Sequence, residues 1–109
     1  MNERLPARLE VATLLRRAQS GGGFATVARR GDPDRGDIVV HLVQRGADVA
    51  LLERRMGDDF TYRWTRRPAP EQGMAAFSSD RARIDPDFWL IELDIADAER
   101  FVAEMIHSG

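Results

Sequence analysis

The sequence predicts an α+β protein whose elements follow the order α-β-β-β-β-α-β-α, with a mainly antiparallel sheet of about five strands and three helices. Helical periodicity lies near the two ends of the chain, and strand-like runs follow one another between turn-forming residues. The length of 109 residues suits a single domain spanning 1–109. We expect the helices to cover one face of the sheet and to leave the other available to a partner.

The first half of the chain predicts one helix and two strands. Apolar residues at spacings of three and four predict an amphipathic helix over 6–19, which the glycines of 21–23 end as a C-cap. Residues 24–29 suit a strand, and turn-forming residues fill 31–36. A strand then starts at Asp37 and is apolar on both faces, as expected of a central strand.

Two hairpin connections lead from this central strand into strands over 49–54 and 60–65, which predicts a three-stranded meander. In the last of these strands Phe60, Tyr62 and Trp64 alternate with polar residues. Successive strand residues point to opposite faces, so this alternation predicts an aromatic inner face.

The last third of the chain predicts a weak helix, a strand and a final helix that carries Phe101, Val102, Met105 and Ile106. The weak helix spans 71–83 and is broken by the proline after Asp85. Residues 88–93 form the most strand-like run in the chain. Asp94 or Asp97 can cap the final helix, because a short carboxylate accepts hydrogen bonds from the first helical N–H groups.

The composition removes several reaction classes. All sixteen basic residues are Arg, there is no Lys or Cys, and the histidines are His41 and His107. Schiff bases, lysine bases, cysteine nucleophiles and cysteine-ligated zinc are therefore excluded. We predict no catalytic residue and no cofactor. The N-terminus lacks the apolar stretch of a signal peptide and no run reaches the length of a membrane span, so a cytoplasmic location is expected.

Charge alternates in sign along the chain while the net charge is only -2. Counting Arg against Asp and Glu gives +4 for residues 1–31, -3 for 32–59, +3 for 60–83 and -6 for 84–109. We expect the acidic end to pair within the fold with arginines of the first helix and the aromatic strand. The other interpretation is an acidic docking face.

Two loops carry the Asp-Pro-Asp pattern and provide the candidate ligand site. Its residues would be Asp32, Asp34, Arg35, Asp85 and Asp87. Their carboxylates suit a hard cation if the two loops meet, but the spacing fails the calcium-loop pattern. Neutralisation by arginines is the simpler prediction, and no metal is assigned.

Two other features have structural and functional interpretations. We expect His41, in the middle of a strand, to be buried and hydrogen-bonded. The other interpretation is a general base, which would need an orienting carboxylate and a substrate cleft, and the sequence shows neither. The arginine doublets and the aromatic strand 60–65 suggest RNA contact, but stacking platforms must be exposed and alternating strands usually bury their aromatics. The near-neutral charge also disfavours nucleic acid as a partner.

Several segments together resemble a small bacterial family of uncharacterised proteins, the domain-of-unknown-function family DUF1491. The segments are Arg4-Leu5-Pro6, Gly22-Gly23-Phe24-Ala25-Thr26-Val27, Gly31-Asp32-Pro33-Asp34-Arg35-Gly36, Asp48-Val49-Ala50-Leu51-Leu52-Glu53-Arg54 and Asp85-Pro86-Asp87-Phe88-Trp89-Leu90-Ile91-Glu92-Leu93-Asp94. The resemblance implies a cytoplasmic domain without an assigned activity, cofactor or catalytic residue.

These observations favour a non-enzymatic interaction or regulatory module that binds another protein or a second copy of itself. The poor catalytic inventory and the surplus of apolar strand residues support this hypothesis. A homodimer is one form it would take, because a second copy commonly closes an uncovered sheet face or edge. The alternative is a small hydrolase or ligand-binding domain that uses the Asp-Pro-Asp loops.

Overall fold

The computed structural model describes residues 5–108 and contains the eight predicted elements in the predicted order. They are α1 (Ala7–Ser20), β1 (Phe24–Arg29), β2 (Ile38–Gln44), β3 (Ala47–Met56), β4 (Tyr62–Arg67), α2 (Met74–Ile84), β5 (Trp89–Asp94) and α3 (Ala98–Ser108). Arg4, which begins the first resemblance segment, lies outside the described residues.

The five strands form one mixed sheet in the order β1-β5-β2-β3-β4. The predicted meander is confirmed, because β2 pairs with β3 and β3 with β4 in antiparallel fashion. β5 enters the sheet between β1 and β2, antiparallel to β1 and parallel to β2. The prediction of a mainly antiparallel sheet therefore holds for three of the four strand pairs, and the parallel pair β2–β5 makes the sheet mixed.

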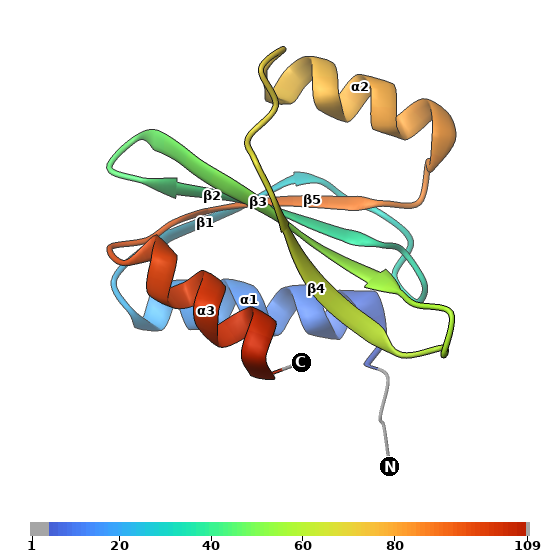
Figure 1. The fold of residues 1–109 in the computed structure, drawn as a ribbon, viewed down its shortest axis with the longest axis horizontal. Coiled ribbons are helices and arrows are strands. Elements are labelled where there is room, and N and C mark those ends of the chain that lie inside the picture. The colour runs from blue at the N-terminus through green and yellow to red at the C-terminus, as the bar shows by residue number, and fades with distance from the viewer. Residues whose placement is uncertain (1–4, 109) are drawn as a thin grey trace.

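Helices cover both faces of the sheet, which corrects the prediction of a single covered face. Figure 1 shows α1 and α3 on one side of the sheet and α2 on the other. The physical reason lies in the central strands, which are buried and apolar on both faces. α2 lies between β4 and β5 in the chain, so the crossover that makes β5 parallel to β2 also covers the second face.

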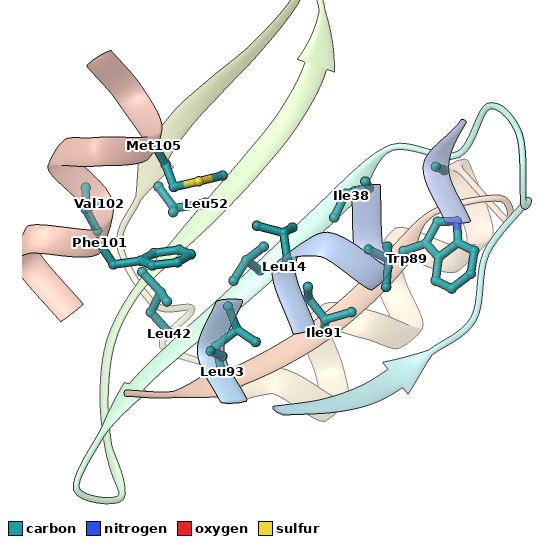
Figure 2. Packing of buried hydrophobic residues seen from close by; sticks show 14 residues of the cluster. Leu14, Ile38, Leu42, Leu52, Trp89, Ile91, Leu93, Phe101, Val102 and Met105 are labelled. Atoms are coloured by element: carbon teal, nitrogen blue, oxygen red, sulfur yellow. The ribbon is translucent and has the colours of Figure 1, made fainter. Parts of the chain in front are cut away.

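The larger core lies between the sheet and the pair α1 and α3. Leu14 of α1 packs with Ile91 and Leu93 of β5, while Phe101 and Met105 of α3 lie at the β3 side of the same cluster (Figure 2). These helix positions recur at spacings of three and four, and the strand positions at spacings of two. The alternation of buried strand residues thus decides which side chains face α1 and α3.

The smaller core lies between the sheet and α2. Val39, Leu51, Phe88 and Leu90 form its buried part, and α2 adds partly buried apolar residues against it. Beside this cluster Arg81 of α2 donates to buried Glu53 of β3, with Nη1 3.0 Å from Oε2.

Two adjacent buried charges in β3 connect the sheet to the helices on its two faces. Glu53 accepts hydrogen bonds from Arg81 of α2 and from Arg67 of β4. Arg54, 2% exposed, points to the opposite face, where its guanidinium stacks on Tyr62 at 4.0 Å and lies 3.5 Å from Glu10 of α1. Each buried charge is therefore compensated by a group of opposite charge.

Two elements start at least two residues later than the sequence predicts. The strand predicted over 60–65 starts at Tyr62, because Phe60 closes the hairpin turn with a φ of 63° and its side chain is 69% exposed. The helix predicted over 71–83 starts at Met74, after Gly73 takes a φ of 91°. Positive φ is the left-handed region, which neither a strand nor a helix accommodates.

The predicted helix ends are confirmed. The amide of Gly23 donates to the carbonyl of Ala18 at 2.9 Å, so the glycines after α1 form its C-cap. At the start of α3, Asp97 Oδ1 accepts from the amide of Arg100 at 3.2 Å, which identifies Asp97 as the N-cap.

We predict that Glu53→Gln lowers the free energy of unfolding at pH 7 by about 1–3 kcal/mol, because it removes a buried charge that is hydrogen-bonded to two arginines. Burial raises the pKa of Glu53, but the hydrogen bonds and charges of Arg67 and Arg81 outweigh burial and hold this pKa below its usual value. The ionised carboxylate therefore stabilises the native state at neutral pH. This contribution is lost as the pH falls through the lowered pKa, so denaturant unfolding should show the difference between Glu53→Gln and the parent protein shrinking on acidification.

Asp37→Asn is the matched control. Burial first, and then the charge of Asp85, raise the pKa of Asp37, so its ionised form costs the native state free energy at neutral pH. We expect Asp37→Asn to be as stable as the parent protein at pH 7, or more stable. Equal stability of Glu53→Gln and the parent protein at pH 7 would contradict the role given to Glu53.

Candidate functional site

The two Asp-Pro-Asp loops of the candidate ligand site meet through their backbones. The amide of Asp32 donates to the carbonyl of Asp87 at 2.9 Å, and the indole Nε1 of Trp89 donates to the carbonyl of Asp32 at 2.7 Å. Gly31 and Gly36 permit this approach, because a Cβ at either position would overlap the carbonyl oxygen of Asp87. The loops are therefore held together by backbone groups and by the indole of Trp89.

The first of these loops, which contains Asp32 and Asp34, also caps the N-terminus of α1. The amide of Ala7 donates to the carbonyl of Asp34 at 3.2 Å, and the amide of Arg8 donates to the carbonyl of Pro33 at 2.9 Å. The first N–H groups of a helix lack partners within it, so these carbonyls satisfy two of them. The loop thus joins α1 to the start of β5.

Three of the four candidate carboxylates have local partners. Asp32 Oδ1 accepts from the amides of Asp34 and Arg35, both at 2.8 Å, and these hydrogen bonds lower the pKa of Asp32. Asp34 pairs with Arg8 at 2.8 Å, and Asp85 lies 3.6 Å from Arg81. Among the residues that the structure describes, no group of three or more His, Asp or Glu side chains is arranged to hold a metal ion.

A carboxylate that the sequence analysis did not identify orients His41. The side chain of His41 is 10% exposed, and its Nε2 lies 2.7 Å from Oδ1 of Asp48 across the β2–β3 hairpin. Its Nδ1 lies 3.7 Å from Oε1 of Glu92 on β5. The sequence places Asp48 just before the strand predicted over 49–54, and the irregular register at Leu42 and Val43 changes which residue faces His41.

The acidic end of the chain pairs with arginines, as predicted. Glu104 of α3 binds Arg17 of α1, and Glu99 of α3 binds Arg66 of β4 through two hydrogen bonds of 2.6 and 2.9 Å. The bidentate pair raises the pKa of Arg66 and lowers that of Glu99. These contacts favour internal pairing over the acidic docking face.

The aromatic residues of the β4 hairpin do not form a flat stacking platform. Phe60 lies in the turn, the ring of Tyr62 is covered by Arg54, and Trp64 packs against the larger core. A platform for bases needs several exposed rings side by side, so this arrangement gives RNA contact no support.

The two edge strands of the sheet differ in charge and in exposure. β1 has the sequence Phe-Ala-Thr-Val-Ala-Arg and exposes Phe24 by 76% and Val27 by 41%. β4 has the sequence Tyr-Arg-Trp-Thr-Arg-Arg, so half of its residues are cationic. An edge strand presents backbone N–H and C=O groups that have no strand beside them, and charged side chains usually protect such an edge. β4 carries this protection, whereas residues 24–27 of β1 do not, since its β-bulge and its charge come only at Ala28 and Arg29.

Together these features define a small α+β protein built on a mixed five-stranded sheet with an edge strand of a different kind on each side. None of the helices within residues 5–108 has both the length and the apolar character needed to cross a membrane. The chain belongs to the DUF1491 family, because residues 5–103 match the family described as "Protein of unknown function (DUF1491)". The resemblance predicted from the sequence is confirmed, and the family carries no assigned function.

Solved structures support this assignment. The chain is similar to the crystal structure of a DUF1491 family protein from Caulobacter crescentus CB15, with 36% sequence identity and a TM-score of 0.72. The match covers 86% of this chain and 91% of that chain. The NMR structure of a DUF1491 family protein from the same organism gives 36% identity and a TM-score of 0.75, covering 88% and 90%. A solution structure of a protein from A. tumefaciens gives 26% identity and a TM-score of 0.73, covering 87% and 89%. No match is found among curated proteins.

We predict that Gly36→Ala destabilises the protein by about 1–3 kcal/mol, because the added Cβ overlaps the carbonyl of Asp87 and crowds Trp89 in a region that cannot yield without moving backbone. Chemical unfolding measures the effect. Gly21→Ala is the control, because Gly21 is exposed and the nearest atom to its added Cβ lies at 3.7 Å. Equal stability of the two variants would show that the loops are not locked together.

Proposed function

We propose that this protein is a non-enzymatic cytoplasmic interaction module of one domain, in which the edge of β1 binds a second copy of the same chain. The observation that carries the proposal is the character of β1. It is an edge strand of six residues, its first five residues are uncharged, and it exposes the two apolar side chains Phe24 and Val27. A neutral, apolar edge strand is a template for pairing with another strand.

Symmetry restricts how two β1 strands pair. A two-fold axis perpendicular to the sheet makes the strands antiparallel and keeps each face of the sheet on its own side. Residues directly opposite one another in antiparallel strands point to the same face. Centred on Thr26, this arrangement sets Thr26 opposite Thr26 of the second copy and Ala25 opposite its Val27. Both Ala25 and Val27 are paired in β5 with residues of the larger core, so they share a face.

The same arrangement explains the contrast between the two edges. At β4, three of the six residues are arginines. If two β4 strands paired in antiparallel fashion, arginines of the two copies would lie opposite or diagonal to one another and would repel. At β1 the regular stretch 24–27 is uncharged, so no charge repels before the register shift at Ala28. A strand pair of this length buries less than a standard interface of about 1,600 Å², so we expect a dissociation constant in roughly the micromolar range.

We predict that sedimentation velocity shows a monomer–dimer equilibrium whose dimer fraction rises with concentration up to about 1 mM, and that Thr26→Lys abolishes the dimer. The substitution sets two ammonium groups opposite each other at the two-fold axis. The exposed Thr26 lies directly across from Glu92 in β5, so the lysine is tolerated in the monomer.

Thr65→Lys is the matched control on the other edge. Thr65 is also exposed, and it also lies directly across from a glutamate, Glu53 in β3. This variant should dimerise like the parent protein. A parent protein that stays monomeric at every concentration, or equal loss of the dimer in both variants, would overturn the proposal.

The alternative function, a small hydrolase or ligand-binding domain at the Asp-Pro-Asp loops, has one supporting observation, the backbone contact between Asp32 and Asp87. The partners of Asp32, Asp34 and Asp85 leave few oxygen atoms for a cation, so we expect no binding. Thermal unfolding with and without about 10 mM Mg²⁺ or Ca²⁺ tests this, since a ligand of the native state raises Tm. A clear rise that Asp87→Asn removes would instead support the alternative.

A further inference from the structure

A groove runs along the second edge strand, β4, beside the end of α3. Its volume is about 670 Å³, and its lining consists almost wholly of consecutive residues of the β4 hairpin, Asp59 and 61–65, with Ile106 of α3 opposite them. The lining contains four successive residues of β4 and Thr61 just before it, so the groove follows the direction of that strand. It therefore has the shape that an extended segment takes when it lies beside a sheet edge.

The two faces of β4 give the groove two different chemistries. Tyr62 and Trp64 point to the side of α3, where Ile106 is 40% exposed. Arg63, Thr65 and Arg67 alternate with them and point to the side of α2, as their pairing with Arg55, Glu53 and Leu51 requires. An added strand also alternates its side chains, so one set would contact the apolar side and the other the cationic side.

The cationic side contains a cross-strand pair of like charges. Arg63 of β4 lies directly opposite Arg55 of β3. Like charges opposite one another in a sheet are unfavourable, and a carboxylate beside them relieves the repulsion. Asp59 does this for Arg63 from within the chain, with Nη2 2.6 Å from Oδ2, while both side chains stay more than half exposed. The ion pair between Asp59 and Arg63 is thus the kind of contact that an incoming carboxylate would make.

We propose that the β4 groove binds an extended segment of another protein whose side chains alternate between acidic and apolar, and that the segment joins the sheet as a sixth strand. Backbone hydrogen bonds to the β4 edge hold it. Its apolar side chains pack on Trp64 and Ile106, and its carboxylates pair with Arg63. A second copy is a poor occupant, because β4 against β4 repeats the like charges.

A capped, fluorescently labelled peptide of about ten residues that alternates Glu and Val is the probe, since a peptide of this length spans a typical edge strand. Anisotropy titration against the full-length protein measures binding, and NMR shift changes locate it. We expect binding that weakens with added salt and shift changes confined to 59–67 and α3 near Ile106. A peptide that alternates Lys and Val should bind at least about tenfold more weakly, because the arginines of the groove repel its lysines.

Arg63→Glu should weaken binding of the acidic peptide by about tenfold or more, because it reverses the charge at the centre of the groove. Its glutamate faces Arg55, so the fold is retained, and circular dichroism checks this. Arg83→Glu is the matched control: Arg83 is 76% exposed on α2 and also pairs with a local aspartate, Asp80, but does not line the groove. It should bind the peptide like the parent protein.

The proposal is overturned if the acidic peptide fails to bind at millimolar concentration, if the Lys and Val peptide binds equally well, or if Arg63→Glu and Arg83→Glu behave alike. The dimer proposed for β1 is tested separately, because Thr26→Lys alters the opposite edge of the sheet. Peptide binding should persist in Thr26→Lys, and dimerisation should persist in Arg63→Glu. Failure of one proposal is thereby distinguishable from failure of the other.

Discussion

The close backbone contact between the 31–37 loop and the start of β5 determines the architecture of the protein. Gly31 and Gly36 let the loop approach Asp87, and the amide of Trp89 donates to the carbonyl of Asp37 at 2.8 Å where β2 and β5 begin to pair. This contact sets β5 parallel to β2 in the middle of the sheet. It leaves β1 on one edge and β4 on the other, and these edges are the surfaces on which the proposed interactions rest.

Local rules predicted the elements, but long-range contacts decided their arrangement. Periodicity, glycine C-caps and the Asp97 N-cap act over a few residues, so the helices, the meander and the strand before α3 could be predicted. The parallel pairing of β5 depends on contacts between Asp32 and Asp87, more than fifty residues apart. The face that α2 covers depends in part on Arg81 meeting Glu53, because the strands are apolar on both sides.

The candidate site illustrates why a residue pattern alone overestimates chemistry. The Asp-Pro-Asp loops do converge, but a short carboxylate in a turn first satisfies neighbouring amides, as Asp32 does, or a nearby arginine, as Asp34 does with Arg8. His41 shows the reverse error. Its carboxylate partner Asp48 was not predicted, because an irregular register in the hairpin changes which residues face each other.

The two edge strands differ in charge, and this difference decides which partners suit each of them. A charged edge strand repels a second copy of itself but attracts a strand of opposite charge. A neutral edge strand has no such repulsion and pairs best with another neutral strand. With arginine as the cation, each guanidinium offers several donors in one plane, so β4 favours carboxylates that arrive in the geometry of a strand. On the two proposals together, a copy at β1 and a different chain at β4 would occupy opposite edges of the sheet and would not compete.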